Sequence, residues 1–195
     1  MASNNRGQRI GIWIIAIVMT VGTIGSFFVI ILQNDNTKID NEKYAAQQVA
    51  YQKQQLAAAQ ANADKSEPLD GYSADTFDSS SVTELKVEVL KEGTGEIIKS
   101  TDSINASYFG WMSDGVIFDS SNKKDAEDAP ITFALSQVIS GWGEGLTGLK
   151  VGSVVRLTIP ADKAYSTSGS GIIPANAPLR FIVEIHKIDN TETAQ

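Results

Sequence analysis

Several residue types that support common chemistries are absent or scarce in this 195-residue chain. It has no cysteine, which excludes disulfides, thiolate metal sites, a cysteine nucleophile and a lipid-modified cysteine anchor. Its single histidine, His186, alternates out of phase with its apolar neighbours, so we interpret it as a surface residue rather than a base or a metal ligand. The net charge is −7 and no stripe of lysine and arginine exists, so nucleic acid is not an expected partner. We predict no metal site and no cofactor.

One apolar run, residues 10–32, carries no charge and is long enough to cross a membrane as a helix. A cleaved signal peptide is the alternative, but the run is too long for one and no small-residue cleavage site follows it directly. Arg6 and Arg9 precede the run, and the residues after it have no positive excess. The positive-inside rule therefore predicts a single-pass membrane protein, with residues 1–9 in the cytoplasm and the remainder outside.

Residues 33–81 have the composition of a connector. Within it, residues 40–65 are rich in alanine, glutamine and lysine and contain no proline or glycine, which predicts a helix. Val49 and Leu56 are seven residues apart, a heptad trace too short to indicate a coiled coil, so we interpret this helix as a solvated spacer. Residues 66–81 contain a proline, a glycine, four acidic residues and many serines, which predicts a flexible joint.

Residues 82–189 have the pattern of a folded domain, followed by a short tail at residues 190–195. Apolar residues spaced as on one helix face predict a short helix within residues 137–148, and the sequence around Gly115 predicts a hairpin turn. Apolar segments, most of them alternating with polar residues, predict strands at residues 85–90, 104–108, 116–118, 154–159 and 179–185. Several antiparallel strands around one short helix give an α+β domain.

Seven blocks in this region occur in an order typical of one family. They are VEVLKEGTGE, Tyr108-Phe109-Gly110, DGVIFDSS at 114–121, PITFAL at 130–135, and residues 137–153, 156–165 and 171–185. Together they resemble the FKBP-type peptidyl-prolyl cis-trans isomerase family, and with the N-terminal run, a membrane-anchored bacterial member. The resemblance implies a curved antiparallel β-sheet wrapped on one short α-helix, with the active pocket between them.

The activity that this resemblance implies is isomerisation of X–Pro bonds, without covalent catalysis, in exported or surface polypeptides. The family also binds macrolides of the rapamycin and tacrolimus type, so these are expected ligands. A second hypothesis is a tethered binding module that holds proline-containing segments without useful catalysis, since a fold does not guarantee activity. A bare anchor or spacer would leave the aromatic residues without a role.

The resemblance also implies two sets of site residues. In the catalytic set, Asp119 faces the carbonyl that rotates, while the Tyr165 hydroxyl and the Ile139 amide donate to substrate carbonyls. The substrate-binding set has Trp142 as its floor and comprises Tyr108, Phe118, Val138, Trp142, Ile173 and Phe181. Taken singly, each aromatic residue is more typical of an ordinary core, Asp119 of a turn cap and Tyr165 of a corner tyrosine, and the joint match in order is what favours the site.

The chain also departs from the family pattern. Ile131 stands where an aromatic residue is frequent, and Ser166 where glycine is usual. A charged insertion at residues 122–129 and a polar loop at 167–170 flank the expected site. The sequence therefore predicts the site but not its rate or its sequence preference.

Overall fold

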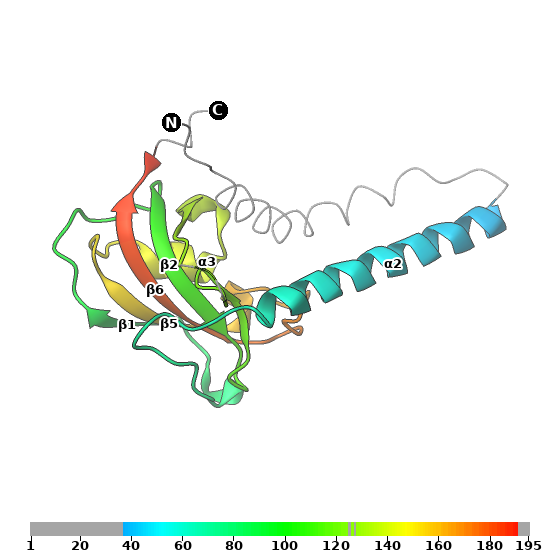
Figure 1. Cartoon of the computed structure of the whole chain (residues 1–195), viewed down its shortest axis with the longest axis horizontal. Helices are drawn as coiled ribbons and strands as arrows, with labels where there is room; N and C mark the ends of the chain where they lie inside the picture. Colours follow the sequence, from blue (N-terminus) through cyan, green and yellow to red (C-terminus); the bar gives the residue numbers. More distant parts are fainter. Residues whose placement is uncertain (1–36, 125, 127, 191–195) are drawn as a thin grey trace.

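A computed structural model describes residues 37–124, 126 and 128–190 (Figure 1). The predicted transmembrane segment, residues 10–32, lies outside the described residues. Among the described residues, no helix is long and apolar enough to cross a membrane. The elements in chain order are α2 (Thr37–Ala63), η1 (Ser79–Ser81), β1 (Lys86–Lys91), β2 (Ser103–Trp111), β3 (Ile117–Ser120), β4 (Ile131–Ala134), η2 (Leu135–Gln137), α3 (Ser140–Leu146), β5 (Val154–Ile159), η3 (Ala161–Lys163) and β6 (Leu179–Ile188).

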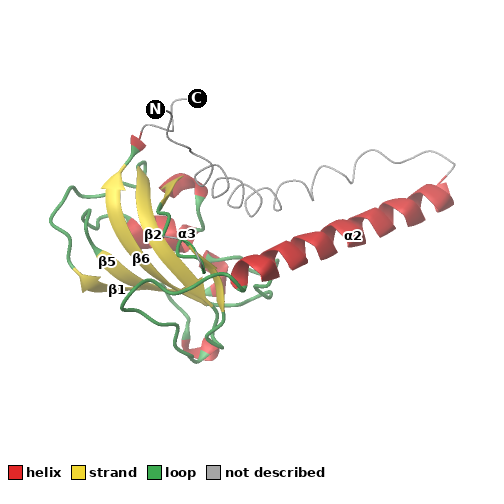
Figure 2. Cartoon of the chain, in the orientation of Figure 1, coloured by secondary structure: helices red, strands yellow, loops and turns green. Residues whose placement is uncertain are grey.

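The strands form one curved antiparallel sheet with α3 against one of its faces (Figure 2). The strand order is β1-β5-β6-β2-β3, and β4 also pairs with β2. The longest strands, β2 and β6, lie side by side in register, with Tyr108 opposite Val183 and Gly110 opposite Phe181. This arrangement confirms the predicted FKBP-like α+β fold. The short strand β4, which the alternation pattern missed, pairs with the first half of β2.

The sheet face that meets α3 carries the main core. Every second residue of the central strands points to this face, because side chains alternate along a strand. Trp142 and Leu146 of α3 cover these side chains, and both are buried. The buried strand residues of this core include Ile104, Ala106, Tyr108, Val155, Leu157, Ile159, Leu179, Phe181, Val183 and Ile185.

The opposite face of the sheet has a second, smaller core. Phe109 and Trp111 of β2 are fully buried there, and Leu69 packs against the cluster with a side chain that is 6% exposed. Tyr72 and Phe77 complete the cover. The segment that contains these residues was predicted as a flexible joint. The structure instead packs it on the sheet, since its few apolar residues meet an apolar face that the strands leave open.

Helix α2 coincides with the helix predicted at residues 40–65 and projects away from the sheet (Figure 1). Tyr44, Val49 and Leu56 are exposed along it, as expected for a solvated spacer. Its C-terminal end, in contrast, contacts β3. Ala63 in the last turn is buried.

Strand β1 forms one edge of the sheet and is largely exposed. Val87 and Val89 are more than two-fifths exposed, and the pairing with β5 is interrupted by a bulge between Val89 and Lys91. Glu88 forms an ion pair with Arg156 of β5. The charged residues therefore alternate with the valines along this edge.

Candidate active site

Trp142 lies at the centre of a cluster of aromatic rings on the α3 face of the sheet. Its ring centroid is 5.3 Å from that of Tyr108, 5.0 Å from Phe133 and 5.1 Å from Phe181. All three contacts are of the edge-to-face type, which is favoured by the charge distribution of aromatic rings. Phe118 extends the cluster by packing on Phe181, with centroids 5.5 Å apart. We call these five residues the aromatic cluster.

Glycine at two positions lets these elements approach one another. A Cβ atom at Gly110 of β2 would lie 2.5 Å from the Phe181 ring and 2.6 Å from the Phe118 ring. A Cβ atom at Gly141 of α3 would lie 2.4 Å from the Ile159 side chain. Any larger residue would force the helix or the rings outward, so these glycines set the spacing of the aromatic cluster.

The indole N–H of Trp142 has no hydrogen-bond partner among the described residues, although it is buried. Most buried polar groups in proteins are paired, and an unpaired donor at a buried site is an unfavourable feature that calls for an explanation. The Trp142 indole is therefore held in place by ring packing rather than by a hydrogen bond to the described residues.

Two further donors lie near the aromatic cluster. Ile139 caps the N-terminal end of α3, and its carbonyl accepts from the Trp142 amide at 2.9 Å. The Tyr165 side chain is half-buried and packs against the main core. Val138 is also half-buried against this core, and Ile173 lies inside it. Eight of the nine predicted site residues thus lie in or against the main core, and the ninth, Asp119, meets them through the Tyr108 hydroxyl.

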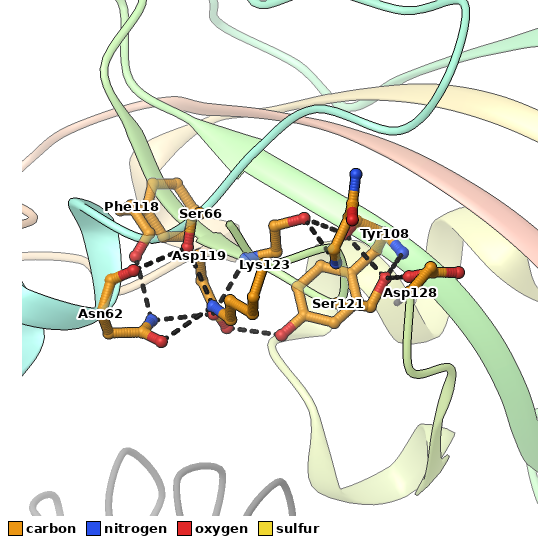
Figure 3. Close-up of polar contacts among 10 residues, drawn as sticks. Asn62, Ser66, Tyr108, Phe118, Asp119, Ser121, Lys123 and Asp128 are labelled. Atoms are coloured by element: carbon orange, nitrogen blue, oxygen red, sulfur yellow. Dashed lines mark hydrogen bonds and ion pairs between the residues drawn. The ribbon is translucent and has the colours of Figure 1, made fainter. Parts of the chain in front are cut away.

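Asp119 is held next to the aromatic cluster by Tyr108. The Tyr108 hydroxyl donates to Asp119 Oδ2 (Figure 3). The Tyr108 ring packs on Trp142. The other carboxylate oxygen, Oδ1, accepts from the Ser120 amide at 2.9 Å. It also accepts from the side chains of Asn62, at 2.9 Å, and Lys123, at 3.0 Å. Both oxygens of the predicted acid are therefore fixed in position.

The environment keeps both tyrosine hydroxyls protonated. Burial raises the pKa of Tyr108 well above its ordinary value, and the charge of Asp119 adds to the shift. Burial, and then the charge of Asp119, raises the pKa of Tyr165 to about 12. At neutral pH both groups are therefore hydrogen-bond donors and neither is a base.

Some residues at the site were missed by sequence reasoning. Phe133 is buried and packs on Trp142, and its position in PITFAL was the only available signal. Lys123 was treated as one charge of the insertion at residues 122–129, and Asn62 as part of the spacer. His186 is exposed on β6, as predicted. Within the described residues, no cluster of histidine and acidic side chains suits a metal ion.

Comparison with known proteins identifies the family. Residues 94–186 match the family model of the FKBP-type peptidyl-prolyl cis-trans isomerase. An FK506-binding protein of Neisseria meningitidis serogroup B is 40% identical over 105 residues, which are 53% of this chain and 95% of that protein. The chain belongs to the FKBP-type peptidyl-prolyl cis-trans isomerase family. Helix α2, the segment at residues 66–81 and β1 all lie outside the residues that the FKBP family model matches.

Other FKBP relatives are longer. The FKBP-type peptidyl-prolyl cis-trans isomerase FkpA of Aeromonas hydrophila is 44% identical over 105 residues, which are 54% of this chain but only 38% of FkpA. FkpA of Escherichia coli K12 is 39% identical, over the same share of each chain. A peptidyl-prolyl cis-trans isomerase of Pseudomonas syringae has a crystal structure with 28% identity and a TM-score of 0.49, covering 72% of this chain and 92% of that one.

Proposed function

We propose that this FKBP-family protein accelerates rotation about X–Pro peptide bonds in exported or surface polypeptides. The observation that carries the proposal is the role of Tyr108 in joining two parts of the site. Its ring contacts Trp142 in the aromatic cluster, and its hydroxyl donates to Asp119. An apolar surface for a proline ring and a carboxylate for the adjoining amide thus lie side by side.

The chemistry requires no covalent intermediate. Resonance gives the planar amide a rotation barrier of about 18–20 kcal/mol, and a twisted amide has lost that conjugation and much of its charge separation. Apolar surroundings therefore favour the twisted form relative to the planar one. In this proposal the Ile139 amide and the Tyr165 hydroxyl hold the flanking carbonyls, and Asp119 faces the rotating carbonyl.

The first test is an isomerisation assay on the full-length chain in detergent micelles. Exchange between the cis and trans forms of a proline tetrapeptide, measured by NMR, should accelerate in proportion to the protein added. Tacrolimus should bind and inhibit the reaction, if the chain shares this property with its FK506-binding relatives. Asp119→Asn should lower kcat more than it raises KM, because it keeps the shape of the side chain and removes the charge that acts on the twisted amide.

The second hypothesis, a tethered binding module without useful catalysis, rests on the state of Asp119. The Lys123 ammonium lies 3.0 Å from its Oδ1, and the side chains of both residues are only 25% exposed. A carboxylate neutralised in this way acts less strongly on a substrate carbonyl. A wild-type protein that binds the proline peptide firmly yet leaves its exchange rate unchanged would establish this function in place of the first.

We also propose that residues 10–32 anchor the protein in the cell membrane with the FKBP domain outside the cytoplasm. The uncharged 23-residue run and the two arginines before it support this orientation. Protease added to intact cells should release the FKBP domain. Full protection of the domain would overturn the orientation, and recovery of the protein only as a soluble form that begins after residue 32 would overturn the anchor.

A further inference from the structure

The last turn of α2 reaches the predicted acid of the site. Asn62, 57 positions before Asp119 in the sequence, donates from Nδ2 to Asp119 Oδ1 at 2.9 Å and to the Phe118 carbonyl at 3.4 Å (Figure 3). We propose that Asn62 is a positioning residue for the Asp119 carboxylate, so that the end of α2 is a working part of the active site. This inference rests on the proposed isomerase function for its kinetic consequences.

The contacts of Asn62 favour one orientation of its amide. Its Nδ2 donates to Asp119, and its Oδ1 accepts from Lys123 Nζ at 2.8 Å. Lys123 in turn donates to Asp119. A flipped amide would set an oxygen against the carboxylate and an NH₂ group against the ammonium, and both contacts are repulsive. The three side chains therefore form a closed triangle in which each holds the other two.

The triangle determines which carboxylate oxygen is free for a substrate. Each oxygen of a carboxylate has about two lone-pair sites. Oδ1 already accepts from Asn62, Lys123 and the Ser120 amide, so it has no further site. Oδ2 accepts from the Tyr108 hydroxyl, the one donor to this oxygen among the described residues. Asn62 and Lys123 thus occupy Oδ1, which leaves Oδ2 as the oxygen open to a substrate.

The main chain fixes the end of α2 at this place. The Lys124 amide donates to the Lys65 carbonyl at 2.7 Å, and the Glu67 amide donates to the Asn122 carbonyl at 3.1 Å. The Ser66 hydroxyl also lies 2.8 Å from Lys123 Nζ. On the other side, a Cβ atom at Gly171 would lie 2.8 Å from the Ala59 Cβ, so the helix packs closely on the loop that carries Ile173.

A merely structural role accounts poorly for this arrangement. Partly exposed ion pairs contribute little to stability, and most of α2 is exposed to solvent. Asn62 also lies outside residues 94–186, the part that matches the FKBP family model, so it is an addition to the FKBP core rather than a part of it. What the contacts of Asn62 do achieve is the orientation of one carboxylate.

The test compares Asn62→Ala with Gln60→Ala in the full-length chain in detergent. Gln60 is the matched control, because it lies two residues earlier in α2, is exposed, and donates from its side chain to Asp64 rather than to the site. Asn62→Ala should lower kcat about tenfold or more, as expected for a lost hydrogen bond to a charged group, with KM little changed and the protein still folded at the assay temperature. Asn62→Asp should lower it further, because it sets a second carboxylate against Asp119. Gln60→Ala should match the wild type.

Two further measurements separate positioning from other effects. The Ser120 amide, which shares Oδ1 with Asn62, should shift its NMR resonance in Asn62→Ala and not in Gln60→Ala. Lys123→Arg should retain more activity than Lys123→Met, because it keeps a donor to the carboxylate. An unchanged kcat together with an unchanged Ser120 resonance would overturn the proposal, as would an activity loss that only follows the unfolded fraction. A wild-type protein without isomerase activity would overturn the proposed function alone, since the Ser120 resonance still reports on the carboxylate.

Discussion

Two buried tryptophans, one on each face of the sheet, differ in how the chain pairs the indole N–H. Trp111 is fully buried, stacks on Phe109 with centroids 5.0 Å apart, and donates its indole N–H to the Asp75 carbonyl at 2.9 Å. Trp142 is 5% exposed and packs against three rings, but its indole N–H has no partner among the described residues. Both rings are buried and both pack on other aromatic rings, but only the Trp111 indole N–H has a hydrogen-bond partner among the described residues.

The difference separates a structural core from a candidate binding surface. The indole N–H of Trp111 donates to the Asp75 carbonyl, so the chain itself pairs the polar group of this side chain. Asp75 lies outside residues 94–186, the part that matches the FKBP family model. The surroundings of Trp142 leave its indole N–H without a partner among the described residues, so this ring depends on aromatic packing alone. The two faces should therefore respond differently to equivalent substitutions.

The largest expected effect is a loss of stability from a change on the outer face of the sheet, the face opposite α3. Trp111→Ala should lower the free energy of unfolding by about 3–5 kcal/mol, because it removes a buried ring and leaves the Asp75 carbonyl without its donor. Urea unfolding measures this change. The kcat/KM of the folded fraction should stay at the wild-type value, and a specific loss of activity would contradict the separation of the two faces.

The cover of the outer face can be tested through Leu69. Leu69→Ala should lower the free energy of unfolding by about 2–4 kcal/mol, since the side chain is 6% exposed against Phe109 and Trp111. Asp70→Ala, one residue further along and exposed, is the control and should change stability little. If Leu69→Ala is as stable as the wild type, residues 66–81 behave as the flexible joint that their composition predicts.

On the inner face, which meets α3, a substitution should weaken ligand binding more than it lowers stability. Trp142→Leu keeps an apolar side chain in the core but removes the aromatic floor. It should weaken the binding of tacrolimus by about 2 kcal/mol, as is usual for a central aromatic contact, while stability falls by less than in Trp111→Ala. Calorimetric titration gives the affinity. Wild-type affinity in this variant would remove Trp142 from the binding surface.

Tyr165→Phe should have the smallest effect on the inner face. It removes one hydroxyl donor, so binding of a proline peptide should weaken by about 0.5–1.5 kcal/mol. The pKa of about 12 for Tyr165 keeps that donor protonated at neutral pH, so tyrosine ionisation should not alter binding between about pH 7 and 10.

The same pKa predicts the behaviour in alkali. The folded state holds the Tyr165 proton more tightly than the unfolded state does. The contribution of Tyr165 to the free energy of unfolding is therefore fully present below the ordinary tyrosine pKa of 10. It is lost as the pH rises from there to about 12. Tyr165→Phe should make this loss less steep in unfolding measured across that range. An equally steep loss would assign the effect to other groups, such as Tyr108.

Much of the fold follows from local patterns in the sequence. Alternation along β2 and β6 predicts both strands, and the apolar spacing around Trp142 predicts α3 within a few residues. Strand β4 was missed because four residues are too few to show a period. The packing of Leu69 was missed for a different reason. A single leucine among serines and acids carries no periodicity, and its burial depends on an apolar surface that other strands build.

The candidate site was predictable only in part. Seven blocks in family order pointed to Tyr108, Asp119 and Trp142, and the structure places all three together. Periodicity alone gives no such information, because it assigns residues to faces but not to neighbours. The contact of Asn62 with Asp119 spans 57 positions between two polar residues, and nothing local in the sequence marks it.

The open edge at β1 bears on how such a protein meets unfolded chains. An exposed strand edge invites a passing chain to add a further strand and remain bound. Here the charges of Lys86, Glu88 and Lys91 and the bulge after Val89 disfavour that addition. Under the proposed function, a client would be held by its proline and the adjoining amide rather than by main-chain hydrogen bonds to β1, and it would leave once the bond had turned.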